Sequence, residues 1–474
     1  MNCAWGGRVN IDQLLASPEG KTLEFKRDIS SAKPILRTLV AFANTAGGTL
    51  IIGRADDGVI VGVKDVLAEE ERLASLIADC IAPAMLPEIE AFSVGDQSLL
   101  LVRVAHWPGP FYLKEKGPEE GVYVRLGSTN RKADSAMLEE LRRQHSNSAF
   151  DQLPCAGTSM ASLDRIAVRR WFMRKDRIMD EAALESLGVM VRHGSGRAVS
   201  NGGLILFGSE EERQRLFPDA RISCARFRGT DKSEFIDRQD MESLLDGLSE
   251  VPKFIARNTR LASRIAGMQR EDIPEYAAIA IREALVNAVA HADYAATGMR
   301  IFVSIFSDRL EIQSPGMLPF GMTMEDFRSG VSRIRNRVIS RVLHEGGMME
   351  QWGSGYQRIR NSCREGGYPE PEWQELASCV RVTFRPHPDV PVNVPVNEPV
   401  NEPVNEPVNE RQQWFIGQLR KGLPCKAEDV MAQWEVSRAT AKRDIADLRE
   451  KGLIEFVGAP KTGSYRLKAD GQND

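Results

Sequence analysis

A four-residue repeat led by proline occupies residues 391 to 410, PVNVPVNEPVNEPVNEPVNE. Proline at every fourth position forbids a helix, and the alternating Val, Asn and Glu offer no face that could pack, so the repeat predicts an extended, semi-rigid spacer. In polyproline II form, at about 3.1 Å per residue, it would reach roughly 60 Å. The other reading is a peptide motif that a partner recognises. In either case a separate module must follow the spacer.

Composition limits what the modules can be. The 474 residues, 42% hydrophobic and 27% charged, allow about three domains. A formal net charge of −4 means that nucleic-acid binding must come from a local basic patch. The seven cysteines are scattered and contain no C-x-x-C pair, which argues against a disulfide framework or a zinc site and for the reducing cytoplasm. There is no apolar run of the roughly 18 residues that span a membrane, so we expect a cytoplasmic protein without membrane contact.

The segment after the spacer, residues 411 to 474, predicts three helices and then two short strands, LIEFVG and SYRLK. Ser437 is a good cap for the third helix, and Ala439, Ile445 and Leu448 have core spacing. This order is typical of a winged helix-turn-helix, whose last helix enters the major groove of DNA. Four residues on its exposed face could reach phosphates and base edges: Arg438, Thr440, Lys442 and Arg443. Winged helices also serve as protein-docking modules, and that alternative stays open.

Two further α+β blocks precede the spacer. Residues 1 to 148 alternate between strand and helix patterns, with a hairpin turned at Asp56-Asp57-Gly58. Residues 149 to 390 combine helices with a hairpin, MRIFVSIFSDRLEIQSPG, and predict a strand-and-helix sandwich. The chain is therefore expected to be an α+β multidomain protein.

Within the second block, IREALVNAVAHADY at residues 281 to 294 predicts a helix with two different sides. Its apolar residues form a stripe wide enough for burial, while Glu283, Asn287 and His291 follow one another at intervals of four, with Tyr294 alongside. An asparagine in mid-helix has poor helix propensity and needs a reason. Its amide oxygen is a hard ligand for Mg²⁺, and a glutamate one turn earlier could position a water on a phosphate. A plain core helix is the competing interpretation.

Four motifs carry a resemblance: REALVNAVAHADY, LEIQSPGMLP, GVSRIRN and EQWGSGYQRIR. They resemble the divergent, RecG-related branch of the histidine-kinase and gyrase-type ATPase fold, a Bergerat-type α/β sandwich found in bacterial transcriptional regulators. The resemblance implies ATP and Mg²⁺ as cofactors, Asn287 as the metal ligand and Glu283 as the catalytic carboxylate. The nucleotide-binding residues that it implies are Asn287, His291, Asp293, Ser314, Gly316, Gly353, Ser354 and Gly355.

One position departs from that family. Its members place an aspartate before their first glycine motif to read the adenine amino group, and here Ser314 stands there. The sequence therefore leaves open which base is bound and whether the nucleotide is turned over, so that a weak ATPase is one expectation. A helicase motor is not expected, because Gly20-Lys21-Thr22 lacks the leading glycine of a P-loop, with Leu15 in its place.

The first block resembles the Alba-like domain of Schlafen proteins in EGKTLEFK, LVAFANTAGGTLIIGRADDG and GVYVRLGSTN. In most bacterial relatives this resemblance implies nucleic-acid binding. In some Schlafen proteins the fold is a metal-dependent nuclease with three acidic residues, whose places here are taken by Glu19, Glu24 and Asp57. Those carboxylates would hold Mg²⁺ or Mn²⁺ against a scissile phosphate. The alternative is that Glu24 pairs with a basic residue and Asp57 only turns the hairpin.

From these observations we expect a nucleotide-responsive, DNA-binding transcriptional regulator that acts as a homo-oligomer. The rival hypothesis is a Schlafen-type metal-dependent nuclease for RNA or DNA that serves in phage defence. A third is an interaction scaffold whose sites have decayed.

Overall fold

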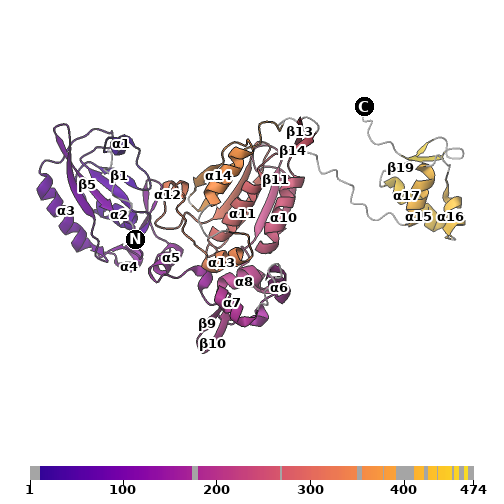
Figure 1. The fold of residues 1–474 in the computed structure, drawn as a ribbon, viewed down its shortest axis with the longest axis horizontal. Coiled ribbons are helices and arrows are strands. Elements are labelled where there is room, and N and C mark those ends of the chain that lie inside the picture. The colour runs from indigo at the N-terminus through magenta and orange to yellow at the C-terminus, as the bar shows by residue number, and fades with distance from the viewer. Residues whose placement is uncertain are drawn as a thin grey trace. The chain divides into compact units, whose positions relative to one another are not determined.

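The computed structural model describes residues 11–172, 180–266, 269–349, 355–376, 378–390, 410–420, 425–434, 436–450, 453–457 and 464–467. The chain forms two compact units, residues 1–397 and 398–474 (Figure 1). In the described residues, no helix is both long and apolar enough to cross a membrane.

The first part of unit 1 is built on a four-stranded sheet of order β1-β2-β5-β4. Strands β1 (Leu23–Lys26) and β2 (Gly48–Ile52) are parallel, because α2 (Ala32–Asn44) connects them, whereas β5 (Gln97–Val104) pairs antiparallel with β2 and with β4 (Glu88–Val94). The other elements here are α1 (Ile11–Ala16), α3 (Val66–Cys80), β3 (Ile81–Ala82), β6 (Tyr112–Leu113), α4 (Gly117–Glu120), the hairpin β7 (Tyr123–Leu126) and β8 (Thr129–Lys132), and α5 (Ser135–His145). The strand and helix alternation predicted for this block is confirmed.

Asn44, the last residue of α2, fixes this helix to the neighbouring chain. It is fully buried, donates from Nδ2 to the carbonyls of Phe111 and Tyr123 at 2.9 Å each, and accepts from the Phe111 amide at 2.7 Å. A buried amide with these partners satisfies backbone groups that would otherwise lack them. The predicted turn is present as well, since Asp57 accepts from the Val59 amide and Arg54 bridges to Ile60.

The larger part of unit 1 contains a six-stranded sheet of order β12-β11-β15-β16-β18-β17. Its strands are β11 (Ile222–Phe227), β12 (Phe235–Met241), β15 (Ile301–Ile305), β16 (Leu310–Pro315), β17 (Glu372–Glu375) and β18 (Cys379–Phe384). Only β11 and β15 pair in parallel. The predicted hairpin of residues 299 to 316 is β15 and β16.

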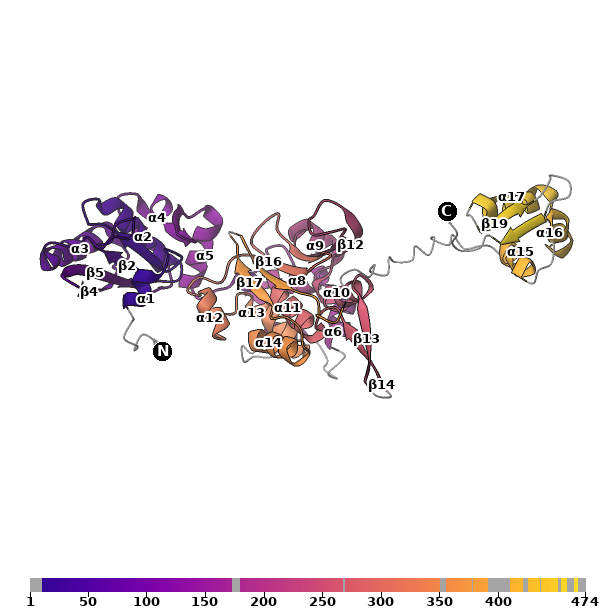
Figure 2. The ribbon, with the colours of Figure 1, turned by 90° about the horizontal axis from the view of Figure 1, so that it is seen from above.

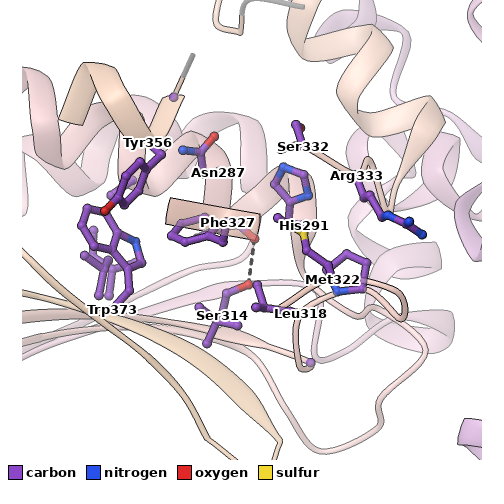
Figure 3. Close-up of a pocket in the computed structure, with 18 of the residues that line it drawn as sticks. Asn287, His291, Ser314, Leu318, Met322, Phe327, Ser332, Arg333, Tyr356 and Trp373 are labelled. Carbon is purple, nitrogen blue, oxygen red and sulfur yellow. Dashed lines mark hydrogen bonds between the residues drawn. The ribbon is translucent and has the colours of Figure 1, made fainter. Parts of the chain in front are cut away.

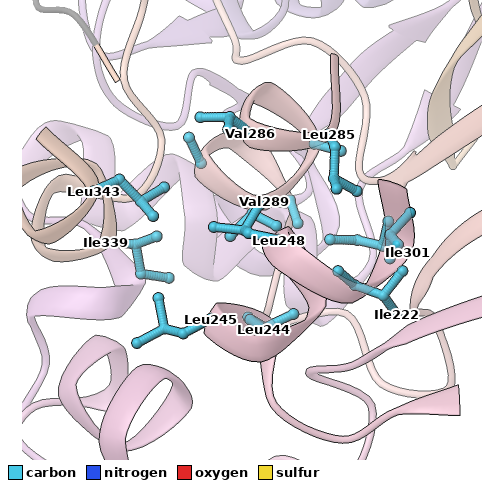
Figure 4. Packing of buried hydrophobic residues seen from close by; sticks show 14 of the residues in the cluster. Ile222, Leu244, Leu245, Leu248, Leu285, Val286, Val289, Ile301, Ile339 and Leu343 are labelled. Atoms are coloured by element: carbon cyan, nitrogen blue, oxygen red, sulfur yellow. The ribbon is translucent and has the colours of Figure 1, made fainter. Parts of the chain in front are cut away.

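Helices α10 (Leu244–Arg257) and α11 (Ala278–His291) lie against this sheet, and α14 (Gly355–Glu365) packs against α11 (Figure 1). Their apolar side chains join those of the strands and of α13 (Arg337–Glu345) in one core, in which Leu285 and Val289 of α11 are fully buried (Figure 4). Truncating such a leucine to alanine typically lowers the free energy of unfolding by about 2–5 kcal/mol. Helix α11 is therefore fixed as a rigid support.

The remaining elements surround this core. They are α6 (Arg165–Phe172), α7 (Glu181–Leu187), the hairpin β9 (Met190–His193) and β10 (Gly196–Val199), α8 (Asn201–Phe207), α9 (Glu210–Leu216), and α12 (Met324–Arg328). The hairpin of β13 (Leu261–Ala266) and β14 (Gln269–Pro274) projects from the rest of the unit (Figure 2).

Unit 2 contains α15 (Glu410–Arg420), α16 (Ala427–Trp434) and α17 (Arg438–Glu450), followed by the antiparallel pair β19 (Ile454–Val457) and β20 (Ser464–Leu467). Three helices and two strands match the predicted element order. The core position at the start of α17 is Ala441, which is fully buried, whereas Ala439 is exposed. The prediction for Ala439 was wrong because Ala441, Ile445 and Leu448, spaced by four and three, form the buried stripe.

Candidate functional site

A cavity of about 140 Å³ lies between α11 and the six-stranded sheet. Helix α11 forms one wall, and β16 with the segment that follows it forms another (Figure 3). Six of the residues predicted from sequence line it together: Glu283, Asn287, His291, Ser314, Gly316 and Gly355. They come from three separate stretches of the chain, namely α11, the end of β16 with the turn after it, and the start of α14. The fold brings these three stretches together.

One end of the cavity is formed where α14 begins beside α11. A β-carbon on Gly355 would lie 2.7 Å from Glu283 Oε1 and 2.8 Å from Asn287 Nδ2, closer than real side chains come. Glycine therefore lets the first turn of α14 approach this polar pair without displacing either side chain. Amide groups at a helix N-terminus favour phosphate, which gives this end the chemistry of an anion site.

Glu283 and Asn287 differ in their partners at this end. The Glu283 side chain is 11% exposed and its Oε2 lies 3.3 Å from Arg358 Nη1, so its charge is paired. Among the described residues, the half-buried Asn287 amide has no hydrogen-bond partner. An unpartnered amide oxygen beside a carboxylate and a glycine turn suits a hard cation such as Mg²⁺.

At the other end, the Ser314 hydroxyl donates to the Ala288 carbonyl at 3.0 Å (Figure 3). Its proton is therefore engaged, and only its lone pairs remain for a ligand. Burial and the nearby Arg335 charge lower the pKa of His291 to about 4, so this imidazole is neutral at neutral pH. The two groups that face a ligand here are both uncharged.

Gly316 is required at the same end for two reasons. Its φ of +91° disfavours a side chain, and a β-carbon would meet Arg335 Nη1 at 2.0 Å and Asp293 Cβ at 2.6 Å. The glycine thus lets Arg335 and Asp293 close over the turn after β16.

Two residues of the predicted polar side do not line the cavity. Asp293 accepts from the Ala295 amide and lies 3.9 Å from Arg335, and Tyr294 donates to the Val289 carbonyl and packs against the core. Tyr294 is therefore a structural residue, because α11 ends at His291 and the chain turns away after it. Gly353 and Ser354 lie outside the described residues.

Sequence reasoning missed the aromatic wall. Phe327 of α12, Tyr356 of α14 and Trp373 of β17 form a cluster with ring centroids 4.8 to 5.8 Å apart, and all three line the cavity. Their spacing along the chain gives no common period, so no sequence pattern joins them. The apolar wall suits the flat face of a ring system.

The segment after β16 also contacts the first part of unit 1. Leu318, which lines the cavity, donates its amide to Glu375 Oε1, and that carboxylate pairs with Lys21 at 2.7 Å. Lys21 belongs to the Gly-Lys-Thr triplet that is not a P-loop, and its role here is this ion pair. Phe320 packs with Val122 and Leu138 in a second contact.

The three carboxylates of the nuclease hypothesis do not gather. Glu24 is buried and pairs with Arg125 and Lys26, Glu19 accepts from the Phe25 amide, and Asp57 accepts from the Val59 amide in the turn. Across the described ranges, no group of three His, Cys, Asp or Glu side chains could hold a metal ion. Glu24 and Asp57 thus have the structural contacts of the alternative interpretation, an ion pair and a turn.

In unit 2 the predicted DNA-binding residues lie on the open side of α17. Arg438, Lys442 and Arg443 are exposed and Thr440 is half-buried, its hydroxyl 3.0 Å from that of Ser437. Arg438 pairs with Glu428 of α16 at 3.0 Å, an exposed contact that contributes little to stability.

Two parts of unit 1 match known protein families. Residues 19–134 match the family model "Schlafen, AlbA_2", and residues 298–384 match "Putative ATP-dependent DNA helicase recG C-terminal". No curated protein gives a significant match.

Similar solved structures include two structural-genomics targets. The DIP2311 protein of Corynebacterium diphtheriae is 19% identical, with 97% of this chain and 98% of that chain covered and a TM-score of 0.40. The N-terminal domain of an ATP-dependent DNA helicase RecG-related protein from Nitrosomonas europaea is 32% identical, with 26% and 90% covered and a TM-score of 0.21. From the family matches, the chain contains a Schlafen AlbA_2 domain and, in its middle part, a RecG-C-terminal-like, ATPase-type domain.

Proposed function

We propose that the protein is a nucleotide-responsive, DNA-binding transcriptional regulator. The observation that carries the proposal is the single cavity that gathers Glu283, Asn287 and Gly355 at one end and His291 and Ser314 at the other. The matched family model, which is described as the C-terminal part of an ATP-dependent DNA helicase, supports ATP as the ligand.

The residues present fit a nucleotide with its metal. The Asn287 amide oxygen would hold Mg²⁺, and the first turn of α14 at Gly355 would face the phosphates. Bound Mg²⁺ would neutralise phosphate charge. We assign this arrangement to a Bergerat-type site, in which the base would lie toward Ser314.

Ser314 favours a base that carries an amino group. Because its hydroxyl proton is donated to Ala288, the oxygen accepts a hydrogen bond from the ligand, as the aspartate of the related ATPases does. Serine thus keeps the acceptor while removing the negative charge. Adenine has the required amino group, and an uncharged acceptor would hold it less tightly than a carboxylate does.

The ion pair of Glu283 with Arg358 favours nucleotide binding over fast nucleotide hydrolysis. A general base must be free to take a proton from the attacking water, and here the Arg358 guanidinium pairs with the carboxylate. We therefore expect slow hydrolysis, so that the bound nucleotide acts mainly as a signal.

DNA binding is assigned to unit 2 as a winged helix, with α17 entering the major groove through Arg438, Thr440, Lys442 and Arg443. The AlbA_2 domain would add a second nucleic-acid contact. The response to nucleotide is tested by measuring the affinity of the full chain for duplex DNA with and without ATP and Mg²⁺. A change in affinity that Asn287→Ala abolishes is expected, and equal affinities under all conditions would refute the regulatory link.

A further inference from the structure

A second cavity, of about 520 Å³, adjoins the first. The two share Pro319, Ser332 and Arg333 in their linings. One side of this cleft is formed by residues 332 to 337, and the other by residues around His106 and by the end of α5 with the turn after it, including Asn147. All of these residues belong to unit 1.

Three arginines within five residues line the cleft, and neutral oxygen atoms fix each of them. Arg333 donates to the Phe320 carbonyl at 3.2 Å and Arg335 to the Met317 carbonyl at 2.6 Å. Arg337 donates to Asn147 twice, to its carbonyl at 2.9 Å and to its Oδ1 at 2.7 Å. A guanidinium has five N–H donors, so these bonds orient the three groups and leave further donors available to a ligand.

Their charge is poorly compensated. Within the described part of the chain, Arg333 and Arg337 form no ion pair, Arg337 interacts at longer range with the buried Asp151, and Arg335 has only Asp293 at 3.9 Å. The one carboxylate that lines the cleft, Glu140, pairs with Arg143 at 2.8 Å.

The arginine charges also contribute to lowering the pKa values of two nearby histidines. Burial and the Arg333 charge lower the pKa of His106 to about 4, and Arg335 acts in the same direction on His291. His106 also bonds the Ala43 carbonyl through Nδ1 at 2.9 Å, so it is a neutral part of the wall. The positive charge of the cleft is therefore that of its arginines.

Trp107 adds a second kind of feature. Trp107 does not itself line the cleft, but along the chain it stands between two residues that do, His106 and Pro108, and it is 52% exposed. Unpaired nucleic acid is bound where cations contact the backbone and an exposed aromatic ring nearby can stack on a base.

We propose that the cleft lined by Arg333 and Arg337 binds the phosphodiester backbone of a single-stranded nucleic acid, with Trp107 of the adjoining segment available to stack on a base. This inference rests on the nucleic-acid-binding part of the proposed function. A nucleotide oriented as proposed directs its phosphates toward Asn287 and Gly355, so the arginines at the opposite end serve another phosphate.

The test uses the full chain and a labelled oligothymidylate of about 20 nucleotides, longer than a typical binding site. Affinity is measured by fluorescence anisotropy between about 50 and 200 mM salt. Arg333→Gln/Arg337→Gln keeps donors for the carbonyls but removes both charges. Arg341→Gln is the matched control, because Arg341 of α13 also donates to a carbonyl, that of Ser186, and does not line the cleft.

We expect the double variant to lower the salt slope by about 0.7 for each lost phosphate contact and to weaken binding roughly tenfold. Trp107→Ala should weaken binding by a similar factor through lost stacking, roughly tenfold. The control should match the wild type, and unchanged thermal melting would show that all variants fold.

If the double variant binds the oligonucleotide with the affinity and the salt slope of the wild type, the proposal is overturned. A double variant that binds ATP more weakly but the oligonucleotide normally also overturns it, because the arginines would then serve the nucleotide. Either result, in a wild-type chain that binds ATP and duplex DNA, refutes the cleft and leaves the proposed function standing. If the wild-type chain does not bind ATP but binds the oligonucleotide in a way that depends on the arginines, the proposal for the cleft is supported. The proposed nucleotide site is then refuted.

Discussion

Gly355 and Asn287 approach each other so closely that a β-carbon on Gly355 would lie 2.8 Å from Asn287 Nδ2. Because Gly355 has no β-carbon, the start of α14 packs closely against the polar side of α11. This contact defines the end of the cavity that we assign to phosphate.

Gly355→Ala should therefore weaken nucleotide binding while the chain stays folded. The added methyl group must displace the ends of the Asn287 and Glu283 side chains from the positions that would hold metal and phosphate, so we expect a loss of affinity of roughly tenfold, about 1.4 kcal/mol. Calorimetry with ATP and Mg²⁺ measures it. Gly20→Ala is the control, since a β-carbon there has no atom within 4 Å. Equal affinity in both variants would show that the contact does not shape the site.

Arg125→Ala should destabilise the AlbA_2 domain by about 3–5 kcal/mol, the usual cost of removing one partner of a buried ion pair. The Arg125 side chain is fully buried and holds the Glu24 carboxylate, which would be left with Lys26 alone. Chemical unfolding followed by circular dichroism gives the change. Lys132→Ala breaks the exposed pair with Glu120 and should leave stability unchanged.

The same pairing predicts that Glu24 is not a nuclease residue. Purified protein incubated with single-stranded RNA and plasmid DNA in Mn²⁺ should show no cleavage that Glu24→Gln removes. Cleavage that depends on Glu24 would restore the nuclease hypothesis and show that the carboxylate leaves Arg125 when metal binds.

Asp151 should make stability depend on pH. Its Oδ2 accepts from the amides of Val338 and Ile339 at the start of α13, and burial raises its pKa from 3.8 to about 6. The folded state therefore binds a proton more readily than the unfolded state, so stability falls as pH rises from about 4 to about 6.

Asp151→Asn keeps an acceptor for both amides and cannot ionise. Its free energy of unfolding, relative to wild type, should increase by an amount on the order of 3 kcal/mol between about pH 4 and pH values above 6. Asp151→Ala, which leaves buried amides unpaired, should lose about 1–3 kcal/mol at any pH. A difference between wild type and Asp151→Asn that does not vary with pH would contradict the shifted pKa.

Arg438→Ala/Arg443→Ala should weaken binding to duplex DNA without affecting folding. On a duplex of arbitrary sequence, the slope of log affinity against log salt should fall by about 0.9 for each lost phosphate contact. Arg449→Ala, an exposed arginine in the last turn of the same helix, is the control. If both variants bind like wild type, α17 is not the DNA-binding helix.

Sequence patterns predicted the local features of the fold better than they predicted the contacts between distant segments. The apolar stripe of α11, the turn at Asp57 and the three helices of unit 2 follow from periodicity and turn chemistry, which act over a few residues. The cavity joins Asn287 to Gly316 and Gly355, which lie about 30 and about 70 residues further along the chain, so only the resemblance linked them.

Other features could not be predicted from pattern at all. The pairing of Glu24 with Arg125 and the aromatic cluster of Phe327, Tyr356 and Trp373 depend on tertiary packing. Helix α11 is buried on more sides than its stripe suggests, since Val286 and Ala290 are buried as well, because α10, α13 and α14 surround it.

The most direct measurement is isothermal titration of the wild-type chain and of Asn287→Ala with ATP in the presence of Mg²⁺. We predict saturable heat for wild type, at one nucleotide per chain, and a loss of at least roughly tenfold in affinity for the variant, since its metal ligand is gone. Wild-type protein that gives no heat, or a variant that binds ATP as tightly as wild type, would contradict the assignment of the cavity as a nucleotide site.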